Sequence, residues 1–205
     1  MDNTALYKLS YGVFMLSTTV DGKANGCITN TCMQVANNPT RIAIACINNN
    51  LTCEMIKKSG VFTLSLLDET CTFDLIKHFG LQSGRDVDKM AGQPLKQDSK
   101  GLYYLTEHTT AFISATVVES MDLGSHTLFI ATVDDAENIS GKAPLTYADY
   151  QSRVKPKPEK PAEQKKVKAW RCKICGYIYE GPDLPGDYKC PVCGHPSDDF
   201  EPIYE

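Results

Sequence analysis

Apolar residues in the first 150 positions cluster in short runs separated by turn residues. The run over 13–20 is followed by Asp21 and Gly22, a pair typical of a hairpin turn, so its partner strand is expected over 26–33. The expected strands cover residues 13–20, 26–33, 41–47, 61–67, 108–120 and 126–133. These strands and their short connections predict a mainly β fold, a split antiparallel β-barrel with peripheral helices.

Helical spacing appears between these strands. Short helices are expected over 4–10 and 51–58, and the second should end near Gly60. The segment 70–90 is helical or irregular, because apolar residues recur on one face only in its first half. These helices are expected to lie around the outside of the barrel.

Residues 151–168 differ in composition from the regions on either side. They combine three prolines with lysines and have few apolar residues, so they are expected to form a solvated tether and not a folded core. The formal charge is −5 over 1–150, +5 over the tether and −4 over 169–205. The predicted organisation is a first domain at 1–150, a linker at 151–168 and a small domain at 169–205.

Composition disfavours several classes of protein. No run approaches the ~18 apolar residues of a membrane helix, and the N-terminus lacks the pattern of a signal peptide. The basic tether contains no aromatic residue and lies between two acidic regions, so nucleic-acid binding is not expected. Nine cysteines without an export signal indicate a reducing compartment, and the expected location is cytoplasmic.

Four cysteines near the C-terminus carry the strongest chemical signal. Two Cys-x-x-Cys pairs, Cys172 with Cys175 and Cys190 with Cys193, are separated by 14 residues, and a glycine follows each pair. Each pair can hold one metal ion from a tight turn, and two such turns complete a tetrahedron. The ion is either a structural zinc or an iron.

The residues around these ligands favour iron. Aromatic side chains can form a low-dielectric shell that a structural zinc does not require: Trp170, Tyr177, Tyr179, Tyr188 and Phe200. The Cys-Gly-Tyr-Ile-Tyr and Cys-Pro-Val-Cys-Gly segments resemble rubredoxin, an electron carrier with one iron on four cysteines. The resemblance covers 169–205, with a shorter stretch between the cysteine pairs than typical rubredoxins have.

The first domain resembles a second family. The segments 25–35, 48–52 and 124–130 have the order and spacing of the flavin reductase family with the FMN-binding split barrel, and the resemblance extends over 4–150. It implies FMN as cofactor and a homodimer, since such barrels often complete the flavin site with a neighbouring subunit. No Rossmann fingerprint follows a strand, so NAD(P)H is expected at the flavin pocket.

The same resemblance implies a set of site residues. Residues expected near the flavin ring and ribityl chain are Asn30, Thr31, Cys32 and Gln34. The start of the helix at 51–58 is expected to hold the phosphate, because free N–H groups there favour an anion, with the side chains of Asn48, Asn50 and Thr52. Further expected contacts are Lys89, Ser83 and Arg85 with phosphate or pyridine nucleotide, and Tyr147 and Tyr150 over the flavin. His126 is the candidate catalytic residue.

Most of these assignments have a structural alternative. Asn50 or Thr52 could merely cap the helix, and His126 could be a satisfied structural histidine. The tyrosines could close the core, and the 83–89 segment could be a solvated loop. The five cysteines of the first domain are expected to be mainly buried small hydrophobes: Cys27, Cys32, Cys46, Cys53 and Cys71.

The whole arrangement, a flavin-binding barrel followed by a rubredoxin, resembles the high-molecular-weight rubredoxins. They imply a relay in which NAD(P)H reduces FMN, the iron takes single electrons, and a flavodiiron protein or similar soluble acceptor receives them. An FMN and iron carrier reduced by another redox protein is the first alternative. A zinc ribbon on a flavin-free barrel is the second.

Overall fold

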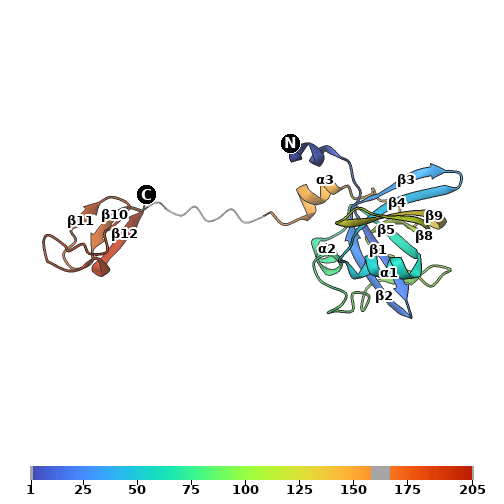
Figure 1. Cartoon of the computed structure of the whole chain (residues 1–205). Helices are drawn as coiled ribbons and strands as arrows, with labels where there is room; N and C mark the ends of the chain where they lie inside the picture. The colour runs from blue at the N-terminus through green and yellow to red at the C-terminus, as the bar shows by residue number, and fades with distance from the viewer. Residues whose placement is uncertain (1, 158–166, 205) are drawn as a thin grey trace. The chain divides into compact units, whose positions relative to one another are not determined.

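The structure is a computed structural model that describes residues 2–157 and 167–204. The chain divides into two compact units, Met1–Pro156 and Lys157–Glu205, and Figure 1 shows the elements of each. Half of the expected linker, 158–166, lies outside the described residues. Within the described ranges, no helix has both the length and the apolar character that a membrane crossing requires.

Seven strands of the first unit form one sheet in which all neighbouring strands are antiparallel. The strand order is β2-β1-β5-β8-β9-β4-β3. The strands are β1 (Phe14–Val20), β2 (Lys23–Thr29), β3 (Cys32–Asn37), β4 (Thr40–Ile47), β5 (Val61–Leu67), β8 (Thr109–Asp122) and β9 (His126–Asn138).

The sheet closes because its two edge strands are consecutive in the chain. Only Asn30 and Thr31 connect β2 to β3, so the two edges lie within about 10 Å of each other. At this seam the hydroxyls of Thr29 and Thr31 donate to the carbonyl of Ala45 in β4, at 3.3 and 2.8 Å. The predicted split barrel is confirmed. The single strand expected over 26–33 is wrong, because the chain crosses from one edge to the other at Asn30.

Alternation along the strands fills the barrel. In β4, Ile42, Ile44 and Cys46 are buried, while Ala43 and Ala45 between them are only half-buried, since successive side chains of a strand point to opposite faces. α1 (Leu51–Ser59) begins at its Asn50 cap and ends at Gly60, which adopts a left-handed φ of 68°. The buried face of α1 joins the same core.

A second core lies under α2 (Phe73–Gly80). Ile76 and Phe79 of this helix pack with residues of β1 and with Leu145. α3 (Tyr147–Asp149) continues into a π-helical turn, Tyr150–Val154, whose last residue packs on this core. Residues 151–154, expected in the linker, are therefore part of the first unit.

Three short elements complete the first unit. η1 (Asn3–Lys8) is the expected opening helix, here a 3-10 helix. β6 (Leu95–Gln97) and β7 (Tyr103–Leu105) form a small antiparallel pair. The sequence did not predict this pair, because three residues are too few to show a strand period.

The second unit is a three-stranded sheet. β10 (Val167–Cys172) lies between β11 (Ile178–Glu180) and β12 (Phe200–Tyr204), and a 3-10 turn, η3 (Ser197–Asp199), precedes β12. The buried core of the unit consists of Cys172, Cys190 and Phe200, with partly buried aromatic rings packed against it. A core this small requires an additional constraint to remain folded, such as a metal ion.

We predict that Gly84→Ala destabilises the first unit by about 1–3 kcal/mol. A Cβ at this position would overlap the side-chain amide of Asn25, which is buried and donates to the Thr52 hydroxyl at 2.8 Å. Gly141→Ala is the matched control, because a Cβ there has no neighbour within 4 Å and no positive φ to strain it. Chemical denaturation measures both variants; equal stabilities would show that the loop moves away freely.

Candidate functional site

The four cysteines of the second unit converge on one point. Their Sγ atoms all lie within 4.8 Å of one another, with 3.7 Å between Cys172 and Cys193 and 3.4 Å between Cys175 and Cys190. A tetrahedron with metal–sulfur bonds of about 2.3 Å has edges of about 3.8 Å. The thiolate set therefore fits a tetrahedral metal ion.

Each Cys-x-x-Cys pair is held by the same local structure. The N–H of Gly176 donates to the carbonyl of Cys172 at 2.9 Å, and that of Gly194 donates to the carbonyl of Cys190 at 2.8 Å. Both glycines adopt a left-handed φ, 77° and 76°, which residues with a Cβ rarely adopt. The turn exposes backbone N–H groups to the sulfurs, as at Cys175, which accepts from Tyr177. Such donors stabilise thiolate charge.

The metal centre is asymmetric. The rings of Tyr188 and Phe200 pack edge-to-face at 5.7 Å, and Tyr179 packs against Tyr188 at 4.7 Å, which gives one side of the centre an apolar cover. On the other side Cys175 is exposed, and so are the apolar residues Ile174 and Val192 inside the two turns. Electrons can therefore reach the ion through an exposed ligand, while water is largely excluded from the opposite side.

The first unit has a cavity of about 280 Å³ at the barrel seam, called the seam pocket below. It brings together six of the residues expected at the flavin: Asn30, Thr31, Asn50, His126, Tyr147 and Tyr150. His126 begins β9 and shares a 2.8 Å hydrogen bond with the Ser125 hydroxyl through Nδ1. The barrel closure thus assembles a site from segments far apart in the sequence.

Backbone and aromatic groups define the walls of the seam pocket. β2 is an edge strand, so alternate residues direct their backbone N–H and C=O groups away from the sheet, where these groups have no strand partner. Such groups can bond to the donors and acceptors of a flavin ring. Tyr147 and Tyr150, with ring centroids 5.7 Å apart, also line the pocket. The pocket therefore offers the mixed polar and aromatic lining that a planar heterocycle needs.

Four expected residues lie outside the seam pocket. Gln34 is exposed on β3 and donates to Asn37 at 2.7 Å. Cys32 packs against the barrel core, and burial raises the pKa of its thiol to about 12. The side-chain amide of Asn48, which follows β4, donates a 2.8 Å hydrogen bond to the Gly124 carbonyl in the turn between β8 and β9. Thr52 is fully buried and accepts from Asn25.

In the 83–89 segment, two side chains expected to contact phosphate or nucleotide bond to other parts of the first unit. Lys89 is buried, and its Nζ donates to the carbonyls of Gly26 and Phe79 at 3.0 and 2.8 Å. Arg85 pairs with Glu54 of α1 at 2.5 Å. Both cations therefore hold elements of the first unit together.

The seam pocket also contains residues that sequence reasoning did not assign to it. Cys27 and Cys46 lie on its floor, and Gly80 and Leu81 at the end of α2 form part of its wall. The alternation of β4 shows that Cys46 points inward, but only the closure brings it opposite β2. Gly80 is a residue typical of a helix end, but only the tertiary structure shows that this end lies at the pocket.

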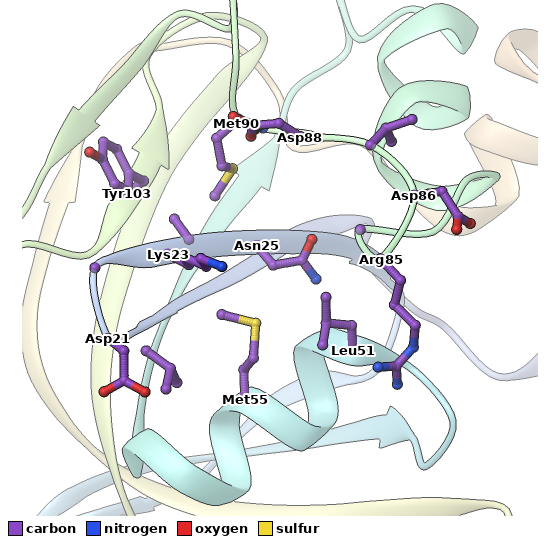
Figure 2. Close-up of a pocket in the computed structure, with 15 residues that line it drawn as sticks. Asp21, Lys23, Asn25, Leu51, Met55, Arg85, Asp86, Asp88, Met90 and Tyr103 are labelled. Atoms are coloured by element: carbon purple, nitrogen blue, oxygen red, sulfur yellow. Dashed lines mark hydrogen bonds between the residues drawn. The ribbon is translucent and has the colours of Figure 1, made fainter.

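A larger cavity of about 770 Å³ lies between the β1–β2 turn, α1 and the 84–90 loop. Figure 2 shows Leu51 and Met55 rising from α1 toward β2, with Met90 above the strand. The Asn25 amide that lines it already bonds to Thr52. Arg85 is the one expected flavin contact among its lining residues, so the seam pocket is the better candidate site.

Two protein-family models match the chain. Residues 6–155 match the flavin reductase like domain, and residues 170–201 match the rubredoxin-like domain of rubrerythrin. The first match covers the whole barrel with the seam pocket, and the second contains all four cysteines.

Individual proteins give the same result. The chain is 34% identical to the high molecular weight rubredoxin of Moorella thermoacetica, over 99% of this chain and 100% of that protein. It is 36% identical to the ferric-chelate reductase (NAD(P)H) of Archaeoglobus fulgidus, over 73% of this chain and 89% of that one. Among solved structures, the flavin reductase PheA2 superposes with a TM-score of 0.61 at 27% identity, over 71% of this chain and 93% of that one.

We predict that Cys175→Ser abolishes iron binding and unfolds the second unit, because three thiolates no longer complete the tetrahedron and the remaining core is small. Bound flavin per chain should be unchanged, since the barrel has its own core. Metal analysis, flavin extraction and NMR of the second unit give the readouts. Ile174→Ser, at an exposed neighbouring position, should keep its iron. Loss of both cofactors from Cys175→Ser would contradict two independently folded units.

Proposed function

We propose that this chain, a member of the flavin reductase-like domain family with a rubredoxin-like domain of four converging cysteines, passes electrons from NAD(P)H through FMN to the Cys₄ iron. It is an electron-transfer oxidoreductase that uses a flavin and one iron. The observation that supports the route most directly is the seam pocket, which gathers Asn30, Thr31, Asn50 and His126 in a chain that also holds the metal centre.

In the seam pocket, the chain's own groups would position the flavin. The free edge of β2 supplies backbone donors and acceptors for the ring, and Asn30 and Thr31 sit where β2 passes into β3. Asn50 lines the same pocket and caps α1 by accepting from the Thr52 N–H at 3.1 Å. The N-terminal end of a helix dipole favours an anion near this residue. FMN held there would supply a carrier that can take up two electrons as a hydride and give them up one at a time.

We assign His126 to the orientation of the nicotinamide at the flavin. Its ring lines the seam pocket, and its bond to the Ser125 hydroxyl fixes the direction of the imidazole. The similarity to a reductase whose name includes NAD(P)H supports this donor. A histidine held in this way can position the carboxamide of the nicotinamide, or hold a proton near it, without taking part in hydride transfer.

The second unit would carry electrons out of the protein. Its Cys₄ iron exchanges one electron at a time, and the exposed Cys175 marks the side where a partner approaches. The region 169–205 has a formal charge of −4, which suits a soluble redox partner with a basic docking surface. A flavodiiron protein is the proposed acceptor, as the likeness to high-molecular-weight rubredoxins implies.

We also propose that the barrel forms a homodimer. An apolar patch spans the outer face of four adjacent strands: Met33 and Val35 on β3, Ala43 on β4, Ile130 on β9, and Val118 and Met121 on β8. Four of these side chains are more than 45% exposed, from Val35 at 47% to Met33 at 64%. Apolar patches of this kind commonly form protein interfaces.

The relay predicts that anaerobic NADH or NADPH bleaches first the flavin and then the iron absorption of the purified protein. His126→Gln should slow flavin reduction at least about tenfold and leave iron and flavin contents unchanged. Stopped-flow absorbance measures both steps. If neither nucleotide bleaches a protein that dithionite does bleach, the chain is instead a carrier reduced by another redox protein.

Separating the two units tests whether iron reduction is intramolecular. The barrel and the iron unit, mixed as separate chains, should show iron reduction that depends on protein concentration, whereas the intact chain should not, because the connection fixes the local concentration.

The dimer predicts that Met33→Glu halves the native mass and lowers flavin occupancy, because a carboxylate in the buried interface is costly. Val87→Glu, a partly exposed apolar residue outside the patch, is the control and should remain dimeric. Light scattering measures the native mass, and flavin extraction measures the bound flavin per chain. A monomeric mass for the unmodified protein with full flavin occupancy would exclude the dimer.

A further inference from the structure

The mechanism proposed above leaves two thiols on the floor of the seam pocket without a role. Cys27 of β2 and Cys46 of β4 both line this pocket. They are only 2% and 3% exposed, so the pocket is the route by which a small molecule reaches them. Both residues also belong to the same cluster of packed core side chains.

The barrel closure explains why these two thiols meet. β2 and β4 are not neighbours in the strand order, but the crossing at Asn30 and Thr31 folds one edge of the sheet against the other. The bonds of Thr29 and Thr31 to Ala45 lie beside the thiol pair. Cys27 and Cys46 therefore come from the two sides of this seam and line the same pocket.

Polar side chains near Cys27 influence its protonation. Thr52, Asn50 and the buried ammonium of Lys89 all lower the pKa of the Cys27 thiol. Thr52 is 0% and Lys89 is 3% exposed. Buried donors and a cation around one sulfur are the environment of a reactive thiolate.

The two thiols differ in their affinity for the proton. The neighbouring Cys46 thiol holds the pKa of Cys27 below its usual range against the opposing effect of burial, with further lowering by Thr52, Lys89 and Asn50. The neighbouring Cys27 and burial raise the pKa of Cys46. Cys27 is thus the nucleophile, and Cys46 keeps its proton.

We propose that Cys27 and Cys46 form a redox-active dithiol at the floor of the seam pocket, which a small hydroperoxide converts to a disulfide. The Cys27 thiolate attacks the peroxide oxygen, the O–O bond breaks, and after proton uptake one water leaves Cys27 as a sulfenic acid. The Cys46 sulfur then displaces the hydroxyl from Cys27, its proton leaves with that hydroxyl as a second water, and the S–S bond forms. Hydrogen peroxide is reduced by two electrons, which the two thiols supply.

The remaining barrel cysteines lack this combination. Cys53 donates to the Cys46 carbonyl at 3.7 Å but does not line the seam pocket. Burial raises the pKa of Cys32 and that of Cys71 to about 12, so both remain protonated. A Cys27–Cys46 bond would also join the two sides of the seam covalently.

The test exposes the intact, iron-loaded protein to one equivalent of hydrogen peroxide, followed by alkylation, denaturation and tryptic mass spectrometry. Cleavage after Lys23, Arg41 and Lys57 places Cys27 with Cys32 in one peptide and Cys46 with Cys53 in the next. The expected product is a cross-link between these two peptides, which a dithiol reductant reverses. No cross-link at peroxide levels that leave the iron site intact would overturn the proposal.

Single Cys→Ser substitutions show which two sulfurs form the cross-link. Cys32→Ser and Cys53→Ser should form the cross-link at the rate of the unmodified protein, whereas Cys27→Ser and Cys46→Ser should reduce it at least tenfold. Cys46→Ser should in addition accumulate a sulfenic acid at Cys27, trapped by dimedone, which a merely misfolded variant would not do selectively. A cross-link that persists in Cys27→Ser, or disappears in Cys53→Ser, would show that the pair is assigned wrongly.

Discussion

The closure of the barrel between β2 and β3 is the constraint on which the first unit depends. Seven strands could form an open sheet, but two residues, Asn30 and Thr31, must join its opposite edges. The sheet therefore curls until the edges meet, and the side chains that alternate inward fill the enclosed core. The same crossing leaves the outer side of β2 unpaired and opens the seam pocket beside it.

The second unit depends on a different interaction. Its buried core is two cysteines and one phenylalanine, too little apolar surface to offset the entropy of ordering nearly forty residues. Four thiolates around one ion supply the missing free energy, so folding and metal binding are the same event. The barrel has no such dependence, and one chain thus combines a self-sufficient domain with a metal-dependent one.

Polar residues near the seam illustrate how strongly packing decides roles. Asn50, Thr52 and Lys89 have side chains suited to a phosphate, and all three come from segments that belong near the pocket. Asn50 does line it, but Thr52 and Lys89 are buried behind the wall, where they bond to Asn25 and to two backbone carbonyls. A buried ammonium or hydroxyl must find partners inside the protein, and here those partners include an amide side chain and two backbone carbonyls.

Features that local spacing encodes could be predicted from the amino-acid order alone. The cysteine quartet needs only two turns of fixed geometry, and the strands around Ile44 and Phe129 need only alternation and β-branched composition. The position of the strand break at Asn30, the meeting of Cys27 with Cys46 and the end of α2 at the pocket wall were decided by the tertiary structure. Each depends on contacts between segments that are distant in the chain. The hydrophobic pattern within one segment does not predict which other segment it will contact.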